Sequence, residues 1–277
     1  DGYGINLRPL SMFAAEVYGD DPCELFKIKT VERENNQIGK IEEQVEMKMQ
    51  KAISVIQFKL EGQMIMRHPE FHMEDRMLLD KVDYEKGTIT IDGNEYKLLD
   101  THFPTIDPAN PYELTEEEEE VMERLTHGFK RCEKLQRHIN FLFNKGSLYL
   151  AMNNNLYYHG CVPLHADGTI RTVTLGGKKL KGKALYDYLE VYLRKGFYMA
   201  DETPEKRYGI DLFWYAWTSP DSPVFGKDKM ATYERYFLAE EETHKENKNP
   251  YYKLIEDSEV SEQVCDSIME EFGMDPK

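Results

Sequence analysis

The longest run of apolar residues at helical spacing is the feature that most constrains this fold. From Ile38 to Met64, apolar residues recur every three or four positions with Glu, Lys and Gln between them, and Pro69 ends the pattern. The spacing predicts one long amphipathic helix. Several methionines lie on its apolar stripe and could form a binding face, but methionine at this spacing is more typical of a packed core.

Shorter patterns predict the elements on either side of this helix. Residues 5–18 have helical spacing, and residues 87–99 alternate around Asp92-Gly93-Asn94, which predicts a β-hairpin. Thr115 precedes five glutamates, 116–120, as is typical of a helix start where acidic groups meet the positive end of the helix dipole. We interpret this run as a solvated helix start and not as a metal site. The apolar spacing predicts that this helix continues unbroken to about Gly146.

The chain changes character after residue 146, where short β-prone runs alternate with turn-forming residues. We predict strands at 147–152 and 156–158, a second hairpin with a strand at 169–174, a helix at 184–194, an irregular stretch at 211–226 and a closing helix at 258–272. A helical first half and a mixed second half together predict an α+β fold.

The net charge and the spacing of the cysteines exclude some classes of function. Lys and Arg number 35 against 51 Asp and Glu, a formal net charge of −16, so nucleic acid and anionic membrane surfaces are poor partners. Four cysteines without CxxC spacing favour unpaired thiols in a reducing cytosol. The first residues include neither an initiator Met nor an apolar signal segment, so we expect a cut chain without a secretory signal.

His159 has the most suggestive setting of the eight histidines. A β-prone run, Asn155–Tyr158, leads directly into His159 and Gly160. A strand end can hold an imidazole in a fixed direction, while glycine lets the backbone turn sharply beneath a ligand or metal. A structural histidine bonded to a turn is the alternative. His68 and His72 have the i, i+4 spacing of a zinc pair, but Pro69 between them breaks the helix, so we predict a loop pair without metal.

Four longer stretches resemble the class III fructose-1,6-bisphosphatases. They are HPEFHMEDRMLLDKVDYEKGTITIDG (68–93), EKLQRHINFLFNKGSLYLAMNNNLYYHGCVPLHADG (133–168), DLFWYAWTSPDSPVFGKDKMATYERYF (211–237) and ETHKENKNPYY (242–252), and the resemblance runs from residue 1 to residue 277. It implies a calcineurin-like αββα metallophosphatase sandwich with a large helical insertion. It also implies hydrolysis of the 1-phosphate of fructose 1,6-bisphosphate, in gluconeogenesis and with manganese.

The resemblance implies a role for His159 and a division of the chain. His159-Gly160 matches the strand-end His-Gly of that superfamily, in which the histidine is a metal ligand. Residues 1–30 are then expected to continue the phosphatase core, 31–145 to form a mainly helical insertion with a hairpin near 87–99, and 146–277 to form a mixed part of the core. Lys134, Arg137, Lys145 and Lys227 are the expected ligands of substrate phosphates in the complete enzyme.

Most of the superfamily's metal motifs are missing from this sequence. It contains no GD-x-H, no GD-x-x-DR, no GNH followed by an acid and no late Gly-His. The family places the first three before DGYGINLRPL and the last after EEFGMDPK, so the resemblance implies a middle section of the enzyme. We therefore expect the isolated chain to be inactive and to lack a tight dinuclear manganese site, and its catalytic residues stay unknown.

Two other functions remain open at this point. The helical region 31–145 could be a non-catalytic interaction or oligomerisation module, which the methionine-rich helix and the missing motifs favour and the His159-Gly160 strand end disfavours. The parent could also be a metallophosphatase for another phosphoester. The resemblance implies a cytoplasmic enzyme with fructose 1,6-bisphosphate as its substrate. We expect no nucleic acid or membrane partner, and a second copy of the chain is a possible partner.

Overall fold

A computed structural model of the chain describes residues 2–27, 37–200 and 203–276. They form two compact units, each built from three chain segments. The first unit comprises Asp1–Arg67, Glu74–Asn140 and Ala231–His244, and the second comprises His68–Met73, Phe141–Met230 and Lys245–Lys277. The assignment of residues 1–30, 31–145 and 146–277 to core and insertion stays a prediction, and its first boundary lies outside the described residues.

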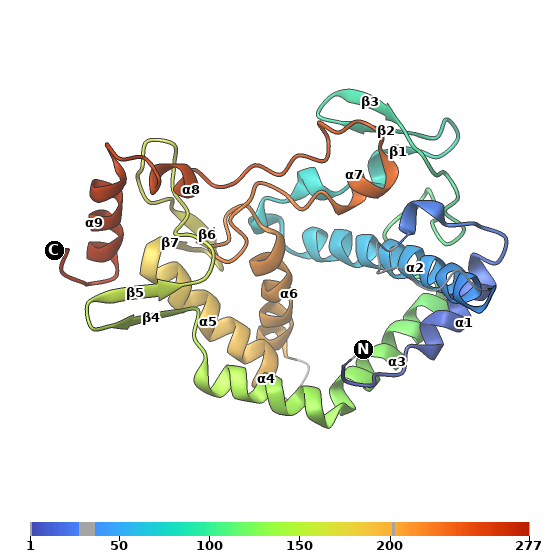
Figure 1. Cartoon of the computed structure of the whole chain (residues 1–277), viewed down its shortest axis with the longest axis horizontal. Coiled ribbons are helices and arrows are strands. Elements are labelled where there is room, and N and C mark those ends of the chain that lie inside the picture. The colour runs from blue at the N-terminus through green and yellow to red at the C-terminus, as the bar shows by residue number, and fades with distance from the viewer. Residues whose placement is uncertain (1, 28–36, 201–202, 277) are drawn as a thin grey trace. The chain divides into compact units, whose positions relative to one another are not determined.

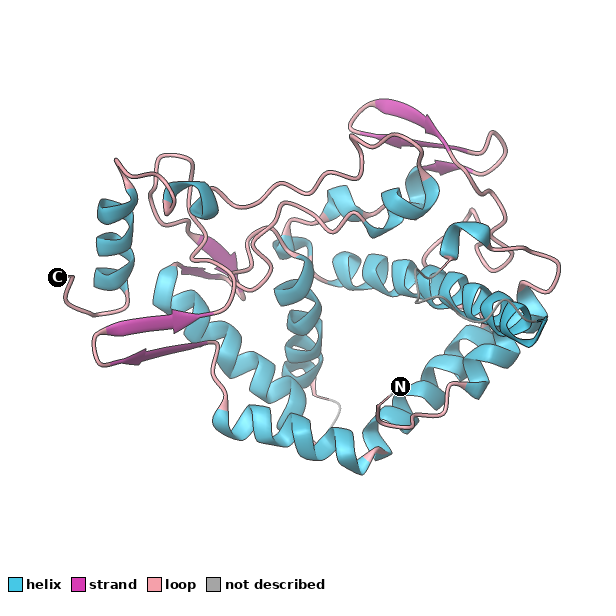
Figure 2. Cartoon of the chain, in the orientation of Figure 1, coloured by secondary structure: helices cyan, strands magenta, loops and turns pink. Residues whose placement is uncertain are grey.

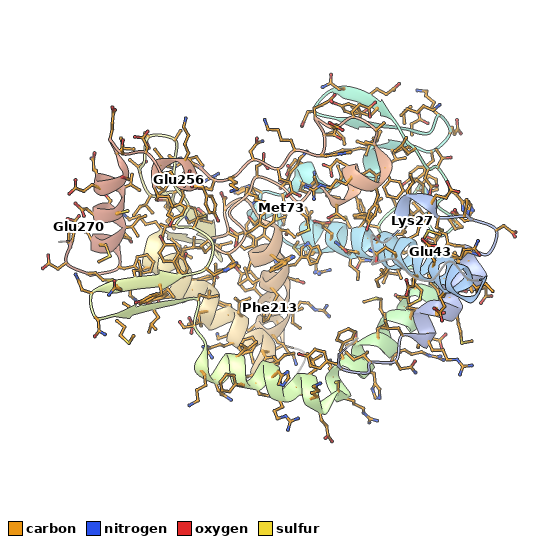
Figure 3. The ribbon with its side chains drawn as sticks, viewed as in Figure 1. Lys27, Glu43, Met73, Phe213, Glu256 and Glu270 are labelled. Atoms are coloured by element: carbon orange, nitrogen blue, oxygen red, sulfur yellow. The ribbon has the colours of Figure 1, made fainter. Side chains whose placement is uncertain are left out.

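The first unit is built around the predicted long helix, which spans Gln37–Arg67 and is labelled α2 in Figure 1. Val55, Ile56 and Phe58 on α2 are buried in a core that also contains Phe13 of α1 (Arg8–Val17). The short turn η1 (Glu24–Phe26) precedes an exposed ion pair, in which Lys27 Nζ lies 3.0 Å from Glu43 Oε1 on α2 (Figure 3). The sequence prediction of one long helix with a core-facing stripe is confirmed.

The predicted hairpin at 87–99 is present in a three-stranded antiparallel sheet of the first unit. Its strands are β1 (Val82–Asp83), β2 (Thr88–Ile91) and β3 (Asn94–Lys97), in the order β1-β2-β3. Asp92 and Gly93 both have positive φ, +51° and +80°, as a tight two-residue hairpin turn requires. Short 3-10 turns lead into this sheet: η2 (Pro69–Phe71), η3 (Glu74–Arg76) and η4 (Leu79–Lys81).

The helix after Thr115 begins as predicted, but Glu118 of the acidic run is buried and not solvated, and the helix does not continue unbroken. Thr115 Oγ1 accepts the N–H of Glu118, and the Glu118 carboxylate accepts the N–H of Thr115 at 2.9 Å, which is a capping box. The helix α3 (Glu116–Arg131) ends at Cys132, whose backbone is extended with ψ 95°, and α4 (Glu133–Lys145) follows. The prediction of one helix to Gly146 was therefore wrong, because the apolar spacing runs across the break and does not reveal it.

The second unit combines helices with two separate hairpins (Figure 2). Its strands are β4 (Tyr149–Met152), β5 (Asn155–Tyr158), β6 (Val173–Leu175) and β7 (Lys178–Leu180). Its helices include α5 (Gly182–Tyr198), α6 (Pro204–Thr218), α8 (Tyr251–Leu254) and α9 (Ser261–Glu271). The helix α7 (Thr232–Phe237) belongs to the first unit. Both hairpins are antiparallel, β4 with β5 and β6 with β7. Buried Cys161, Val162 and Tyr186 share its core with Ile268 and Phe272.

Two predictions for this half need correction. The stretch 211–217 is not irregular but forms the C-terminal half of α6, which Thr203 caps by accepting the N–H of Lys206, with Pro204 in the first turn. The second hairpin is present, but its first strand is Val173–Leu175 and not 169–174. Residues 164–170 instead form a turn closed by a bridge between Leu164 and Ile170.

The described residues confirm the α+β class, since helices predominate and the strands form three small antiparallel sheets. A calcineurin-like sandwich is not seen in these sheets and stays a prediction. Over the described residues, no helix is both long and apolar enough to cross a membrane.

Candidate functional site

His159 stands directly after β5, as the sequence predicted, and its side chain is exposed. Pairing of Tyr149 with Tyr158 anchors the strand end that carries it. Tyr158 is fixed further by a hydrogen bond between its hydroxyl and that of Tyr251, at 2.6 Å. Among the described residues, the His159 imidazole has no hydrogen-bond or ion-pair partner, so either ring nitrogen is free to bind a ligand.

Gly160 makes the turn after His159 possible. Its φ is +83°, and a Cβ built on it would lie 2.2 Å from the carbonyl oxygen of Pro223 and 2.8 Å from that of Val224. No other residue fits there, because a side-chain carbon cannot approach a carbonyl oxygen so closely. The same close contact between the two backbones allows the Cys161 N–H to donate to the Pro223 carbonyl at 2.8 Å.

A second loop, residues 245–250, joins the same site. The Asn249 N–H donates to the Gly226 carbonyl at 3.0 Å, and the buried Asn249 Oδ1 accepts the N–H groups of Leu164 and Tyr251. Asp228 accepts two hydrogen bonds from Asn247. Two loops therefore support the strand end at His159. The loop with Pro223 accepts a hydrogen bond from Cys161, and the loop with Asn249 is hydrogen-bonded to Gly226 and Leu164.

Cys161, two residues after His159, is not a candidate metal ligand or nucleophile. It is fully buried, and burial raises the pKa of its thiol to about 12. A thiol in this state stays protonated at neutral pH, whereas binding a metal or attacking a phosphorus atom requires the thiolate. All four cysteines are unpaired, as predicted.

Of the four predicted phosphate ligands, Lys145 and Lys227 lie in the unit that carries this strand end, and Lys134 and Arg137 lie in the other unit. Lys134 belongs to the first unit and donates to the Gly2 carbonyl at 2.9 Å, and Arg137 is exposed on the same helix, α4. Lys145 is exposed at the end of α4, in the second unit. Only Lys227 lies in a loop of the site, where its ammonium is 2.8 Å from the Glu246 carboxylate.

His68 and His72 do not form a metal pair. The ring of His68 lies between two carboxylates, with Nδ1 3.0 Å from Glu70 and Nε2 2.8 Å from Asp211. His72 adopts a left-handed backbone, φ +52°, at the end of η2. Over the described residues, no three His, Cys, Asp or Glu side chains come close enough together to hold a metal ion. His159 is one exposed donor at a strand end, and its role as a metal ligand stays a prediction.

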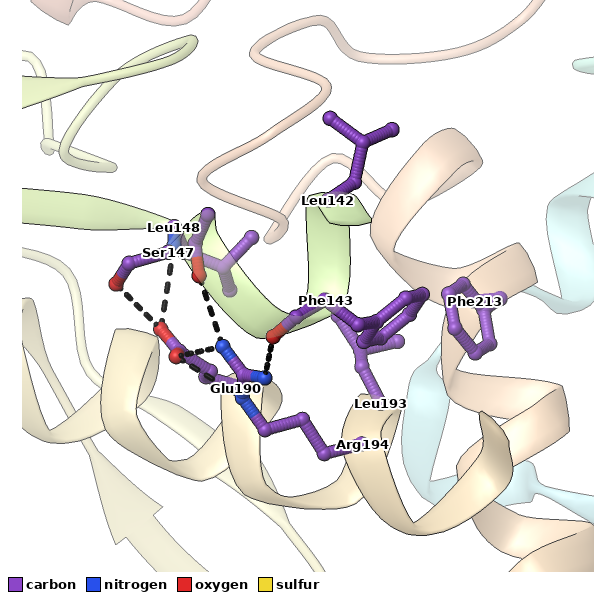
Figure 4. Close-up of a pocket in the computed structure, with 9 residues that line it drawn as sticks. Leu142, Phe143, Ser147, Leu148, Glu190, Leu193, Arg194 and Phe213 are labelled. Carbon is purple, nitrogen blue, oxygen red and sulfur yellow. Dashed lines mark hydrogen bonds and ion pairs between the residues drawn. The ribbon is translucent and has the colours of Figure 1, made fainter. Parts of the chain in front are cut away.

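An apolar cavity in the second unit does not suit a sugar phosphate. It has a volume of about 280 Å³ and is lined largely by Leu142, Phe143, Leu148, Leu193 and Phe213 (Figure 4). Its one cation, Arg194, is already paired with Glu190 and also donates to the carbonyls of Phe143 and Gly146. A phosphate would therefore enter an apolar space without a free cation.

Comparison with known proteins decides the family. A sequence profile described as "Firmicute fructose-1,6-bisphosphatase" matches residues 1–277. The chain belongs to this family. No solved structure shows a significant match to it.

Proteins named "Fructose-1,6-bisphosphatase class 3" match this chain along nearly its whole length. The protein from Listeria innocua is 50% identical over 275 residues, that from Clostridium novyi 51% over 278, and that from Clostridium botulinum strain Loch Maree 52% over 275. These matches cover 99%, 100% and 99% of this chain but only 41%, 40% and 40% of the respective relatives. The chain thus spans about two fifths of the length of the relatives it matches.

Proposed function

We propose that this chain is a section of a class III fructose-1,6-bisphosphatase, which hydrolyses fructose 1,6-bisphosphate to fructose 6-phosphate and phosphate. The observation that carries the proposal is about 50% identity over nearly every residue of the chain to relatives bearing that name. The activity belongs to the longer protein, because the chain spans about two fifths of those relatives. A cytoplasmic role in gluconeogenesis is part of the same proposal.

In the complete enzyme, His159 is proposed to be one ligand of a manganese centre. Bound divalent ions would supply Lewis-acid polarisation of the phosphoryl group and a nucleophile from water at neutral pH. The contribution of this chain is to hold the His159 imidazole in one place. β5 sets its direction, Gly160 brings the backbone against Pro223, and Asn249 locks the neighbouring loop.

The small β4–β5 hairpin supports the proposal that the complete enzyme contains a larger sandwich. An isolated two-stranded hairpin is marginally stable in water. The outward face of this one carries Leu150, Met152 and Tyr157, each about half exposed. Further strands of a complete enzyme would cover that face, and the isolated chain would then lack both the sandwich and the remaining metal ligands.

The function is tested by measuring phosphate release by the complete protein, expressed from its full reading frame, with manganese present. We expect release from fructose 1,6-bisphosphate and much slower release from glucose 6-phosphate, which carries a single phosphate. The 277-residue chain is expected to release none. Equal rates on both substrates would instead support the metallophosphatase of other specificity, and no release on either would reject the proposal.

A second candidate role, as a contact surface between copies, is favoured by one observation on α4. Phe141 and Leu142 are 63% and 64% exposed, which is unusual for adjacent large apolar side chains. Sedimentation velocity of the complete protein tests this role. A dimer or larger species that Phe141→Ser converts to monomer would support it, and a monomer at all concentrations would reject it.

A further inference from the structure

An arginine that the sequence did not single out lies beside the loops that support His159. Arg171 Nη2 is 2.9 Å from Asp221 Oδ1, and the side chains are 39% and 17% exposed, respectively. The backbones of both residues are fixed. The Arg171 N–H donates to the Pro163 carbonyl at 2.8 Å, and the Asp221 N–H donates to Ser219 Oγ at 3.2 Å.

Both residues belong to the loop system that contains the Gly160 turn. Pro163 follows Gly160 by three residues, and Asp221 precedes Pro223, whose carbonyl approaches Gly160. The Arg171 guanidinium has five N–H donors, and its one charged partner among the described residues is Asp221. More than a third of the side chain faces solvent, so a ligand can reach the guanidinium.

Two exposed imidazoles act on the same carboxylate. Burial raises the pKa of Asp221, while Arg171, His72 and His165 oppose that rise electrostatically. His72 lies at the end of η2, Arg171 and His165 belong to the turn at 163–171, and Asp221 lies in the loop after α6. A further carboxylate near His165, that of Asp167, is occupied within its own turn by the N–H and hydroxyl of Thr169, at 3.0 and 2.7 Å.

The cluster therefore has more groups that bind anions than it has carboxylates to neutralise them. That excess stands out in a chain with a formal net charge of −16. A planar guanidinium held at one edge by a fixed carboxylate can present its other edge to two phosphate oxygens, and nearby imidazoles add positive charge when they are protonated. Lys227 is less suitable, because its ammonium lies 2.8 Å from the largely buried Glu246 carboxylate.

We propose that Arg171, positioned by Asp221, binds a phosphoryl group. The assignment of that group to the substrate rests on the proposed function. In that reading Arg171 holds a phosphate of the sugar bisphosphate beside the strand end of His159, and Asp221 acts only by positioning the guanidinium. Free inorganic phosphate offers the same chemistry, so the test must separate the two sources.

The test is a titration of the 277-residue chain followed by NMR of the histidine ring protons at constant pH and ionic strength. The probes are inorganic phosphate, fructose 1,6-bisphosphate and sulfate. We expect saturable shifts of the His72 and His165 signals. Tighter binding of the bisphosphate than of phosphate would assign the site to substrate, and equal binding would assign it to free phosphate. Equal response to sulfate, or no saturable shift, would overturn the proposal.

Variants locate the site. Arg171→Gln is expected to weaken phosphate binding about tenfold, from the loss of a charge-assisted contact. The matched control Arg131→Gln, exposed at the end of α3, should leave binding unchanged. Arg171→Lys keeps the charge beside Asp221 and guards against misfolding, and it should lose about threefold or more because an ammonium lacks the planar fork. Unchanged binding in both Arg171 variants would overturn the proposal.

Failure of this inference is distinguishable from failure of the proposed function. The titration measures binding and needs no activity, whereas the proposed function is tested by phosphate release from the complete protein. Hydrolysis by the complete protein with unchanged phosphate binding in the Arg171 variants would reject only the phosphoryl site. Phosphate binding that depends on Arg171, together with no hydrolysis, would reject only the proposed function.

Discussion

His68 Nε2 lies 2.8 Å from a carboxylate oxygen of Asp211, a residue 143 positions later in the chain, and both side chains are largely shielded from solvent. The other ring nitrogen is 3.0 Å from Glu70. Two neighbouring carboxylates favour the protonated form of an imidazole. This contact joins the short segment 68–73 to α6 within the second unit.

The pH dependence of stability follows from this pair. Burial alone would lower the pKa of His68, but its hydrogen bonds to Asp211 and Glu70 outweigh burial and raise it above the ordinary value of 6.5. Its stabilising effect is therefore complete below about pH 6.5 and is lost as the pH rises through the folded-state pKa. Urea unfolding of the chain between pH 5.5 and 8.5 should show His68→Gln flattening that decline. The control His127→Gln, exposed on α3, should retain the wild-type slope, and an equal slope in both variants would contradict the prediction.

The close approach of Gly160 to Pro223 predicts a large effect of one added carbon. Gly160→Ala should destabilise the chain by about 2 to 4 kcal/mol, from strain at positive φ and a clash with fixed carbonyls. Gly177→Ala is the matched control, because Gly177 also has positive φ, +73°, but open space around a Cβ. It should cost about 1 kcal/mol. Chemical denaturation measures both, and equal losses would show that the contact with Pro223 is not the cause.

A buried ion pair stabilises the first unit only while both members are present. Lys59 Nζ is 2.7 Å from Glu118 Oε2, and the two side chains are 0% and 1% exposed. Lys59→Met should cost about 3 to 5 kcal/mol, because it leaves a buried carboxylate unpaired. Adding Glu118→Gln, which keeps an acceptor for the Thr115 cap, should recover part of that loss. Unfolding measurements should show Arg124→Met, which breaks an exposed pair with Glu120, changing stability by less than about 0.5 kcal/mol. A double variant less stable than Lys59→Met would contradict this account.

Manganese binding by the isolated chain should be weak. His159 provides one donor, and a tight site requires several ligands in fixed geometry. Isothermal titration with manganese should show no dinuclear site in the micromolar range. Two ions bound tightly per chain would mean that the 277 residues contain a complete centre, and the proposal of missing ligands would then be wrong.

The elements predicted correctly from sequence are those whose signals are local. The helix α2 has an apolar stripe over many turns, the β2–β3 hairpin has Asp92-Gly93 at its turn, and Thr115 with Glu118 forms a capping box. The errors have physical causes. The apolar spacing continues across the break at Cys132, so the sequence pattern does not indicate it. The aromatic residues of α6 were not recognised as helical, although Thr203 as cap and Pro204 in the first turn indicate a helix start.

In the candidate site too, only features with a local sequence signal were recognised from the sequence. His159 and Gly160 were found because a strand end and a glycine are adjacent in sequence. Asp221 and Arg171 lie 50 positions apart, and neither has a distinctive neighbour, so only the fold brings them together. Lys134 and Arg137 were chosen because they lie near helix ends or turns; both belong to the first unit, and their role in phosphate binding stays a prediction.

The most direct measurement compares the complete protein with its His159→Ala variant, for manganese content and for phosphate release from fructose 1,6-bisphosphate. Loss of a metal ligand should lower bound manganese and reduce the rate about 100-fold or more. The control His127→Ala should retain both. Full manganese content and full activity in His159→Ala would contradict the central claim that this strand end is part of the metal centre of a fructose-bisphosphatase.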